Sequence, residues 1–336
     1  MKALVYTGPH ALALHDLPVP SPVPGEALIR VEAVGICGSD MHAYHGHDSR
    51  RPAPLVLGHE AAGRIVGGPR DGRRVTINPL VTCGTCVACT AGRSHLCPDR
   101  QILSMPPRAG AFAEYVCAPE SNLVEIPEDL PIVKAALAEP LAVSYHAVNL
   151  GARLLCRPLS GADCAVLGGG AIGLGAALVL AMQGARTVSL AEPNPERRAT
   201  IARAASGVRC YGPDEVGRPV EGSADLIVDA VGSRATRAAA SRLTRPGGVI
   251  VHVGLLPGDE GLDIRKLTLQ EIVVSGSYCY TGQEFRDIVG IIAAGRLGAL
   301  DWAEERALAD GVAAFAAIDA NTTASPKIVL RPHGAP

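Results

Sequence analysis

The sequence predicts an α/β protein in which a β-rich part is followed by a doubly wound parallel sheet. Up to about residue 140, runs of β-branched residues are bounded by glycine and proline, which is typical of short strands. Further along, buried-strand patterns alternate with helix patterns, and such alternation indicates βαβ units. The 336 residues suffice for about two domains, and hydrophobic residues, at 48%, can fill their cores.

The expected elements follow this order along the chain. The β-rich part has strand candidates at residues 26–36, 61–68 and 71–79. Residues 164–185 form an apolar strand, a glycine turn and a helix, and residues 187–207 repeat the strand-then-helix pattern. Further buried strands are expected at residues 224–233, 247–255 and 271–278, with helical stretches before the last two. We expect the alternation to stop after about Tyr278 and residues 325–330 to form one last strand.

Composition and charge exclude several classes of function. The formal net charge is −2 and no long run of Lys or Arg occurs, which argues against nucleic acid or an anionic membrane as a partner. The longest apolar stretch, residues 173–182, is too short to span a bilayer, and the N-terminal residues lack the pattern of a secretory signal. We therefore expect a cytoplasmic protein, in which thiol clusters are more often metal sites or catalysts than disulfides.

A glycine-rich turn between a strand and a helix predicts a dinucleotide site. Gly168, Gly170 and Gly173 fit the pattern G-x-G-x-x-G in that context. The first glycine allows a tight turn, the second lets the backbone approach a pyrophosphate, and the third allows close packing of helix on strand. The N-terminus of the helix then offers N–H groups to the phosphates.

An acidic residue after the next strand bears on the choice of cofactor. Glu192 stands 19 residues beyond Gly173, where a carboxylate can accept both ribose hydroxyls of NAD and would repel a 2′-phosphate. Arg197 and Arg198 could instead approach such a phosphate. The sequence favours NAD and leaves NADP as the alternative.

Four closely spaced cysteines predict a metal site. Cys83, Cys86, Cys89 and Cys97 have the spacing C-x2-C-x2-C-x7-C, and four thiolates close a tetrahedron around a structural zinc ion. The alternative is a zinc ribbon that binds nucleic acid, but this normally has two separated C-x2-C pairs and a basic surface. Here Arg93 is the only fixed charge between the cysteines.

A second group of potential ligands is scattered along the β-rich part. One Cys, one His and one or two Glu suit a zinc ion with an open coordination position. Spacing alone cannot join these residues, and each taken singly has an ordinary structural explanation. The candidates are Cys37, Ser39, Asp40 and His42 in residues 35–42, His59 and Glu60 in residues 57–63, and Glu139 in residues 138–147.

In combination and in order, these motifs resemble the zinc-dependent medium-chain dehydrogenases, and within them the sorbitol and L-idonate (polyol) dehydrogenase branch. The resemblance covers essentially the whole chain, through residues 35–42, 57–63, 83–97, 138–147, 168–173 and 326–330. It implies a GroES-like β-rich catalytic domain at residues 1–142 with a structural zinc lobe at 80–98. It further implies a Rossmann dinucleotide-binding domain at 143–277 and a C-terminal segment, 278–336, that returns to the catalytic domain.

The resemblance also implies roles for individual residues. Cys37, His59, Glu60 and Glu139 would surround the catalytic zinc, and which glutamate ligates directly varies within the family. A Glu at position 139, where classical alcohol dehydrogenases have Cys, resembles the polyol branch. Asp40 resembles the residue that orients the histidine ligand, and Ser39 and His42 resemble the proton relay. The residues matching the cofactor site are Gly168, Gly170, Ile172, Gly173, Glu192 and Arg197.

The implied activity is hydride transfer from a secondary alcohol of a polyol or sugar acid to NAD, with zinc at both sites. The substrate is a small molecule, and a homodimer or homotetramer is expected. At two positions the sequence departs from the polyol dehydrogenases, and both departures argue against sorbitol itself as the substrate. Cys279 occupies a position where polyol enzymes often carry a substrate-binding Arg, and Ala43 one where sorbitol dehydrogenases often carry Tyr.

Three alternative functions are compatible with the same fold. In the loop at residues 43–54, four side chains could receive an anion such as a polyol phosphate, as in galactitol-1-phosphate 5-dehydrogenase, or could simply be solvated: His45, His47, Arg50 and Arg51. A metal-free quinone reductase of the same fold would lack Cys37, His59 and the four-cysteine lobe. A non-catalytic nucleotide- or zinc-binding protein on the same scaffold would not need Ser39 and His42.

Overall fold

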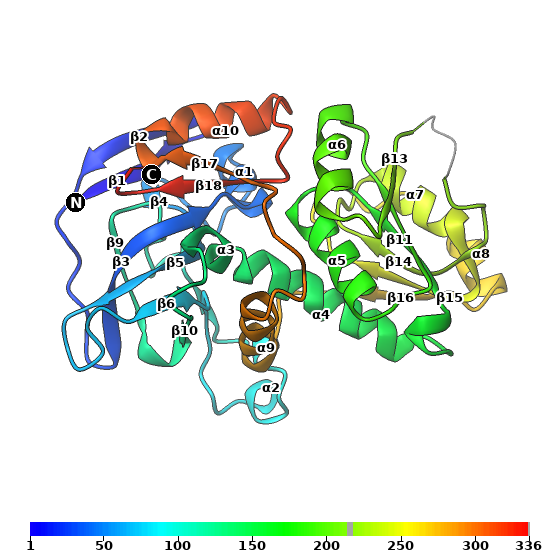
Figure 1. The fold of residues 1–336 in the computed structure, drawn as a ribbon, viewed down its shortest axis with the longest axis horizontal. Coiled ribbons are helices and arrows are strands. Elements are labelled where there is room, and N and C mark those ends of the chain that lie inside the picture. Colours follow the sequence, from blue (N-terminus) through cyan, green and yellow to red (C-terminus); the bar gives the residue numbers. More distant parts are fainter. Residues whose placement is uncertain (214–217, 335–336) are drawn as a thin grey trace.

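Two sheet-containing halves lie side by side in the computed structural model, which describes residues 1–213 and 218–334 (Figure 1). The half on the left of Figure 1 holds the N-terminal strands together with β17 and β18 from near the C-terminus. The half on the right holds a parallel sheet. Two segments far apart in the chain therefore build the first half.

The first half is mostly antiparallel. A three-stranded sheet has the order β2-β1-β4, and a larger sheet has the order β10-β6-β5-β3-β18-β17, with β9 also pairing with β3. Strand β3 alternates between buried and half-buried residues until its last residues, which are buried on both faces. The elements are β1 (Lys2–Gly8), β2 (Ala11–Asp16), β3 (Glu26–Gly35), α1 (Gly38–Tyr44), β4 (Leu55–Val56), β5 (Glu60–Val66), β6 (Arg74–Ile77), β9 (Tyr115–Pro119), η2 (Glu120–Asn122), β10 (Leu123–Glu125) and α3 (Ile132–Ala136).

The second half is a six-stranded sheet in which every neighbouring pair is parallel. Its order, β13-β12-β11-β14-β15-β16, changes direction at β11, as in a doubly wound sheet, so the carboxyl ends of β11 and β14 form the switch point. The predicted α/β class is confirmed. The elements are η3 (Leu159–Gly161), β11 (Asp163–Leu167), α5 (Ala171–Met182), β12 (Thr187–Ala191), α6 (Pro195–Ala204), β13 (Arg209–Tyr211), β14 (Ala224–Asp229), α7 (Arg234–Leu243), β15 (Thr244–His252), α8 (Ile264–Leu269) and β16 (Val273–Gly276).

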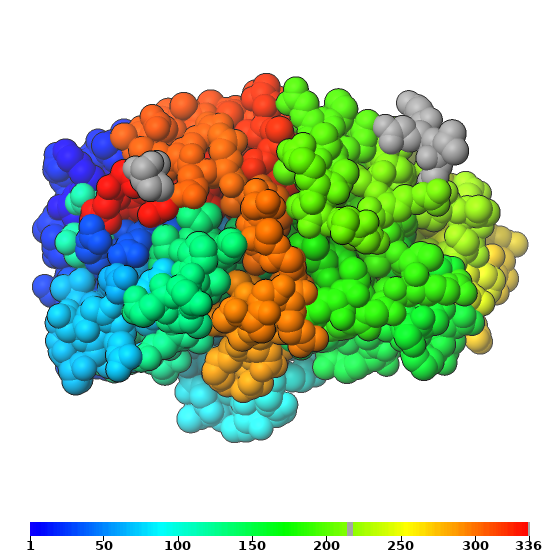
Figure 2. Space-filling model, viewed as in Figure 1, coloured from blue at the N-terminus to red at the C-terminus, as the bar shows by residue number. Residues whose placement is uncertain are grey.

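Helices α4 (Ala138–Leu154) and α9 (Gly282–Ala293) lie where the halves meet. Figure 2 shows α9 on the surface between the two halves. One buried hydrophobic cluster runs from the parallel sheet through α4 and α9 to Ala33, Ala62 and Val329 of the larger antiparallel sheet. The halves thus share a continuous core, while a second cluster fills the N-terminal half.

The expectation that strand–helix alternation stops after Tyr278 is wrong in one respect. Strand β17 (Ala303–Ala307), helices η4 (Leu308–Asp310) and α10 (Gly311–Asp319), and strand β18 (Lys327–Arg331) form a further parallel strand–helix–strand unit. The sequence of β17, AEERA, is short and polar, so no hydrophobic pattern marks it as a strand. Strand β18 matches the expected last strand and pairs with β3.

A small lobe projects from the first half, at the bottom of Figures 1 and 2. It contains the four closely spaced cysteines and consists of β7 (Leu80–Val81), α2 (Val87–Thr90), η1 (Ser94–Leu96) and β8 (Gln101–Ile102). Within the described part of the chain, no helix combines the length and apolarity that crossing a membrane requires.

Candidate catalytic metal centre and cofactor site

Strand register brings three candidate ligands together. In the β3–β5 pair, Gly35 lies opposite Glu60, so Cys37, two residues further on, comes next to His59 and Glu60. Ligand atoms of Cys37, His59 and Glu60 all lie within 4.8 Å of one another. A Cβ atom at Gly35 would stand 2.0 Å from Oε2 of Glu60, so only glycine leaves room for this carboxylate.

The Glu60 carboxylate is half satisfied. Nζ of Lys327, on the neighbouring strand β18, donates to Oε1 of Glu60 at 2.6 Å and to the carbonyl of Ile36 at 2.8 Å. Glu60 is fully buried, and its Oε2 has no hydrogen-bond partner among the described residues. Because a buried polar atom without a partner is costly, this oxygen together with the thiol and imidazole fits a bound cation.

His59 is oriented from its other side. Its Nδ1 lies 3.4 Å from Oγ of Ser104 and 3.6 Å from Oδ1 of Asp40, which leaves Nε2 as the nitrogen available to a metal. Asp40 also accepts the main-chain N–H groups of Cys37 at 2.9 Å and Gly58 at 3.4 Å. Burial is the largest single influence and raises the pKa of Asp40, but the charges of His59 and Arg51 together with hydrogen bonds from His59 and the N–H of Cys37 outweigh it, so the pKa is lowered.

Glu139 lies near this cluster but outside the group of three. It is buried in the first turn of α4, and its Oε1 accepts a hydrogen bond from the hydroxyl of Tyr280 at 2.9 Å. Burial, with repulsion by Glu60 acting in the same direction, raises the pKa of Glu139 to about 7. A cation in the cluster would reverse this effect, because it would favour the charged carboxylate.

Ser39 and His42 share one face of helix α1, because residues three apart are neighbours on a helix. Both side chains are partly accessible. Burial, together with the charges of nearby histidines, lowers the pKa of His42 and so favours its neutral, proton-accepting form. Helix α1 begins directly after Cys37, so Cys37 and Ser39 belong to the same turn of the chain.

The idea that the loop at residues 43–54 receives an anion is wrong for Arg51. This side chain is only 3% exposed, and its guanidinium donates to the carbonyls of Ser39 and Ser104 and to Asp48. Arg50 is exposed but pairs with Asp48 through two nitrogens. His45 pairs with the carboxylate of Asp319. Through Arg51 the loop is bonded to helix α1. The prediction of a simple solvated basic loop is therefore also wrong for Arg51.

The glycine-rich turn has the geometry of a close strand–helix junction. Gly168 has a φ of +97°, and a Cβ atom at Gly173 would stand 1.7 Å from the carbonyl oxygen of Gly168. Gly170 begins helix α5, and a Cβ atom there would meet no atom within 4 Å, so the backbone is open on that side. The carbonyl of Ile172 accepts the hydroxyl of Ser144 on α4.

The Glu192 carboxylate lies beside this turn. Its Oε2 accepts the N–H of Gly169 at 2.9 Å, and its Oε1 accepts the N–H of Asn194 at 2.8 Å. Nη2 of Arg197 donates to Oδ1 of Asn321 and to the carbonyl of Thr323, in the segment between α10 and β18. Arg197 therefore links the two halves of the protein.

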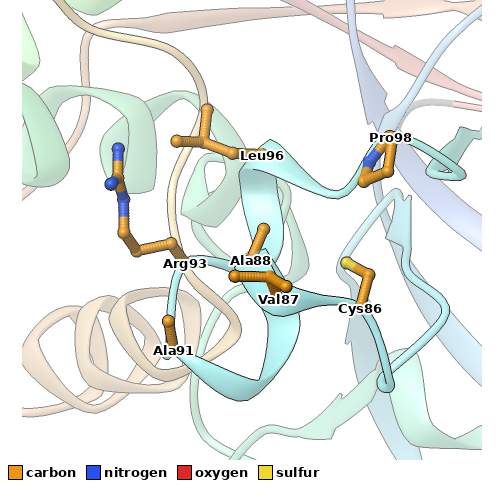
Figure 3. Close-up of a pocket in the computed structure, with 7 residues that line it drawn as sticks. All are labelled: Cys86, Val87, Ala88, Ala91, Arg93, Leu96 and Pro98. Atoms are coloured by element: carbon orange, nitrogen blue, oxygen red, sulfur yellow. The ribbon is translucent and has the colours of Figure 1, made fainter.

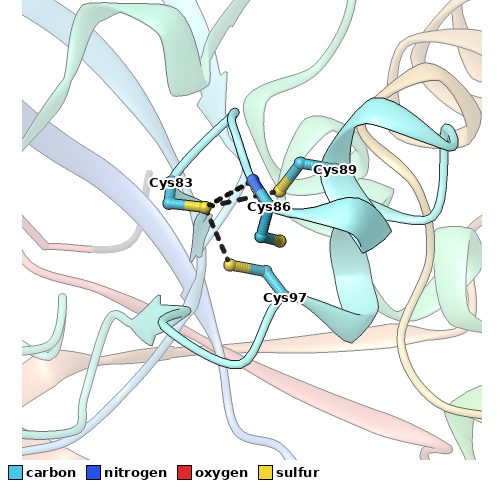
Figure 4. Close-up of side chains that lie close together, drawn as sticks. All are labelled: Cys83, Cys86, Cys89 and Cys97. Carbon is cyan, nitrogen blue, oxygen red and sulfur yellow. Dashed lines mark hydrogen bonds between the residues drawn. The ribbon is translucent and has the colours of Figure 1, made fainter.

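The four cysteines of the lobe converge (Figure 4). Sγ of Cys83 lies 3.9 Å from that of Cys89 and 3.5 Å from that of Cys97, and Zn–S bonds of about 2.3 Å would put tetrahedral sulfur atoms about 3.8 Å apart. Main-chain N–H groups of Thr85 and Cys86 lower the pKa of Cys83 to about 6, which favours its thiolate. This geometry fits a four-thiolate zinc site.

A hollow of about 460 Å³ lies beside this cluster. Figure 3 shows its lining, which is mostly apolar and includes none of the Cys37–His59–Glu60 cluster. The lining residues are Cys86, Val87, Ala88, Ala91, Arg93, Leu96 and Pro98.

Sequence reasoning missed what three residues do at the site. Lys327 neutralises one oxygen of Glu60, Tyr280 binds Glu139, and Arg51 binds Ser39. The signal for Lys327 is a cation directly before three apolar residues, in a strand that begins with Lys327 and ends with Arg331 (KIVLR). The other two side chains reach the site only through the folded topology, and no local pattern marks them.

The chain resembles known dehydrogenases over most of its length. The model of the alcohol dehydrogenase GroES-like domain matches residues 23–128, and the model of the zinc-binding dehydrogenase domain matches residues 171–294. L-galactonate-5-dehydrogenase of Escherichia coli K12 is 33% identical over 89% of this chain and 89% of its own length. Sorbitol dehydrogenase of Bacillus subtilis 168 is 35% identical over 83% of this chain and 82% of its own length.

Two solved dehydrogenase structures have the same fold as this chain over nearly its whole length. A zinc-binding dehydrogenase of Sinorhizobium meliloti 1021 bound to NADP has a TM-score of 0.85 at 29% identity, covering 98% of this chain and 99% of its own. An alcohol dehydrogenase of E. coli CFT073 complexed with NADH has a TM-score of 0.86 at 25% identity, with the same coverage.

Proposed function

Since the chain belongs to the zinc-dependent alcohol and polyol dehydrogenases with a GroES-like domain, we propose that it oxidises a secondary alcohol of a sugar acid or polyol with NAD. The observation that carries the proposal is the convergence of Cys37, His59 and the unpartnered Oε2 of Glu60, next to the helix that bears Ser39 and His42. Zinc and a nicotinamide cofactor follow from the family; the residues that hold them and the substrate are our assignments.

We assign the catalytic zinc to Cys37, His59 and Glu60, with Glu139 as an alternative ligand in place of Glu60. Glu60 is the better candidate because its free oxygen already belongs to the cluster, whereas Glu139 is held by Tyr280. When bound, zinc would polarise the alcohol oxygen as a Lewis acid and NAD would take the hydride. Asp40 keeps His59 in the tautomer that leaves Nε2 free.

Ser39 and His42 move the proton in this proposal. The Ser39 hydroxyl accepts the proton released by the alcohol, and His42, on the same face of α1, passes it towards solvent. The lowered pKa of His42 suits this role, because a neutral imidazole can accept a proton at neutral pH. The four cysteines of the lobe hold a second, structural zinc in this scheme and take no part in the chemistry.

The carboxylate at the end of β12 supports NAD over NADP. Glu192 is almost fully buried beside Gly169, where its charge would repel a 2′-phosphate. Nη1 of Arg197 lies 3.5 Å from Oε1 of Glu192, and its Nη2 donates to Asn321 and Thr323, so this guanidinium is already engaged by groups of the protein. The backbone N–H groups at the start of α5, beyond Gly168 and Gly170, would then receive the pyrophosphate.

A sugar acid is the substrate class that the surroundings of Cys279 favour. Position 279 is a cysteine rather than an arginine, but Arg100 lies against the preceding residue, Tyr278. Arg100 donates from Nε to the hydroxyl of the adjacent Tyr278 at 3.2 Å and lies 4.8 Å from its ring centre. The relative named L-galactonate-5-dehydrogenase is consistent with a carboxylate substrate, and L-threonine 3-dehydrogenases that are 33% identical make an amino acid the second candidate.

We also propose a homo-oligomer formed through the edge of the parallel sheet. Strand β16 is the edge strand, and its Val273 and Val274 are exposed, as are Leu269 and Ile264 of α8. An apolar edge strand readily pairs with another chain. Light scattering of the purified protein, with Val274→Lys as the disrupting variant, tests this point.

The deciding experiment is a substrate panel with both cofactors. We expect kcat/KM to be highest for L-galactonate or L-idonate with NAD, lower for sorbitol and galactitol 1-phosphate, and at least tenfold lower with NADP. Arg100→Gln should reduce the preference for the acids, while Arg50→Gln, next to the buried Arg51, should leave it unchanged. A preference for L-threonine would show that the substrate is an amino acid, the second candidate. The absence of turnover with any alcohol would overturn the proposal.

A further inference from the structure

Two imidazoles and a carboxylate converge on the surface, in a group that shares no residue with the two cysteine-containing clusters. His10 lies in the turn between β1 and β2, His45 directly follows α1, and Asp319 ends α10. Their ligand atoms all lie within 4.8 Å of one another. Nε2 of His45 is 2.6 Å from Oδ1 of Asp319, and Nδ1 of His10 is 3.9 Å from Oδ2. The three residues are more than 30 positions apart along the chain, so the fold alone assembles them.

The backbone around this group is fixed by buried contacts. The N–H of His10 donates to the carbonyl of Tyr44 at 2.7 Å, which ties the β1–β2 turn to the end of α1. The ring of Tyr44 lies 5.5 Å from that of Phe315, a fully buried residue of α10. The three segments that carry the group are therefore held in place by a core, and only side-chain rotations remain free.

The position of the carboxylate is unfavourable without a positive partner. Asp319 is the last residue of α10, where the helix dipole places partial negative charge, and the last turn of this helix holds no basic residue. A cation bound to Asp319 would offset this repulsion. Two neutral imidazoles and one carboxylate form the donor set that zinc and related divalent ions take in open, three-ligand sites.

The spacing of the atoms is compatible with such an ion. Bonds of about 2.0–2.1 Å from zinc to nitrogen or oxygen require ligand atoms about 3.3 Å apart. Nε2 of His45 and Oδ1 of Asp319, at 2.6 Å, would move apart, and Nδ1 of His10 and Oδ2 of Asp319, at 3.9 Å, would approach, each by less than 1 Å. The ligand nitrogens of His10 and His45 lie within 4.8 Å of one another and would also approach. His10 and Asp319 are exposed and His45 is half-buried, so water could complete the coordination.

We propose that His10, His45 and Asp319 form a surface site for a divalent transition-metal ion of the zinc class, separate from the two zinc sites of the family. An ion there joins the β1–β2 turn, the end of α1 and the end of α10. It therefore stabilises the part of the fold that carries the helix with Ser39 and His42.

The test uses the tag-free holoprotein that already contains its two family zinc ions. Zn²⁺ is titrated in a weakly chelating buffer, and bound metal is counted by mass spectrometry alongside the thermal midpoint. We expect the wild type to take up one further equivalent and to gain thermal stability. His45→Gln and Asp319→Asn, which preserve side-chain size, should weaken this uptake at least tenfold and remove the gain.

His15→Gln is the matched control, because His15 is an exposed histidine on the neighbouring strand β2 and belongs to none of the groups. It should bind the further equivalent as the wild type does. Equal uptake by the wild type, His45→Gln and Asp319→Asn would overturn the proposal, as would the absence of a further equivalent in the wild type. Because the readouts are metal content and stability, the result does not depend on which substrate is oxidised.

Discussion

The guanidinium of Arg51 donates to both the carbonyl and the hydroxyl oxygen of Ser39, at 3.0 and 3.4 Å. The same buried side chain donates to the carbonyl of Ser104 and to Asp48, so it is fixed at several points. Ser104 in turn lies against Nδ1 of His59. One arginine thus connects the relay hydroxyl to the histidine that we assign to the zinc.

We predict that Arg51 sets the orientation of Ser39 during turnover. Its hydrogen bond occupies one lone pair of the hydroxyl oxygen and leaves the other for the substrate proton. Arg51→Lys keeps the charge but loses the planar fork, so kcat should fall by about 10- to 100-fold with KM changed less than threefold, since a misplaced catalytic group costs about that much. Steady-state kinetics measures both constants.

Arg50→Lys is the control for this variant, because Arg50 shares the partner Asp48 but makes no contact with Ser39 among its hydrogen bonds. It should leave kcat within twofold of the wild type. If Arg51→Lys behaved in the same way, Arg51 would be a structural residue only.

Removal of the Ser39 hydroxyl should slow chemistry without affecting the cofactor. General acid–base groups contribute about 10²- to 10⁴-fold to rates, so Ser39→Ala should lower kcat by about that range. The dissociation constant of NAD, measured by fluorescence or calorimetry, should stay the same because Ser39 belongs to helix α1, which lies outside the half that holds the parallel sheet. Unchanged kcat would contradict the relay.

Lys327 should stabilise the metal-free protein more than the metal-loaded one. Lys327→Met leaves the buried Glu60 carboxylate without its cation, and breaking a buried pair typically costs about 3–5 kcal/mol. With zinc bound, the ion supplies the missing positive charge, so the substitution should lower the free energy of unfolding by less. Thermal unfolding of the variant with and without a chelator measures both losses. Equal losses would show that Glu60 does not face the metal.

The sequence correctly predicts the parallel sheet, and it selects the candidate ligands for a different reason. Strands β11, β12, β14 and β15 each contain at least three consecutive buried residues, most of them apolar, as expected for strands covered on both faces. The candidate ligands are recognisable because residue types such as Cys, His and Glu are unusual in apolar surroundings. Neither signal depends on knowing which strands are neighbours.

The contacts between the ligands and their supporting residues depend on strand register and could not be predicted. Lys327 reaches Glu60 because β18 returns to pair with β3 after nearly the whole chain has intervened. Tyr280 reaches Glu139 through the packing of α9 beside α4. The conformation of the loop at residues 43–54 is likewise set by burial of Arg51, whereas an arginine in a Gly- and Pro-containing stretch ordinarily indicates a solvated side chain.

The cysteine lobe should be needed for stability and not for chemistry. Cys86→Ser removes one of four thiolates, and structural zinc contributes about 10–16 kcal/mol in small zinc domains, so this variant should lose one zinc per chain and unfold at lower temperature. Activity per folded, zinc-loaded catalytic site should persist. Cys156→Ser, at an exposed cysteine outside both clusters, should change neither property. A stable Cys86→Ser protein that lost only turnover would reverse the assignment.

The ion pair between α4 and α9 predicts a pH dependence of stability. Oε2 of Glu284 accepts hydrogen bonds from Nδ1 of His146 at 2.8 Å and from the N–H and hydroxyl of Thr281. Burial alone would raise the pKa of Glu284, but these hydrogen bonds outweigh it and lower the pKa to about 2, from an ordinary value of 4.5. The unfolded chain therefore binds more protons between these values, and stability rises with pH across this window.

The contribution of the ionised Glu284 to the free energy of unfolding is fully present above about pH 4.5 and is lost as the pH falls towards 2. Glu284→Gln should reduce the free energy of unfolding at pH 7 by about 2 kcal/mol, allowing for screening by solvent. The gap in thermal midpoint between wild type and variant should then narrow as the pH is lowered from 4.5 towards 3. Glu221→Gln, at an exposed acid, should show no such gap. A gap that stays constant with pH would mean that the glutamate acts through packing and not through its charge.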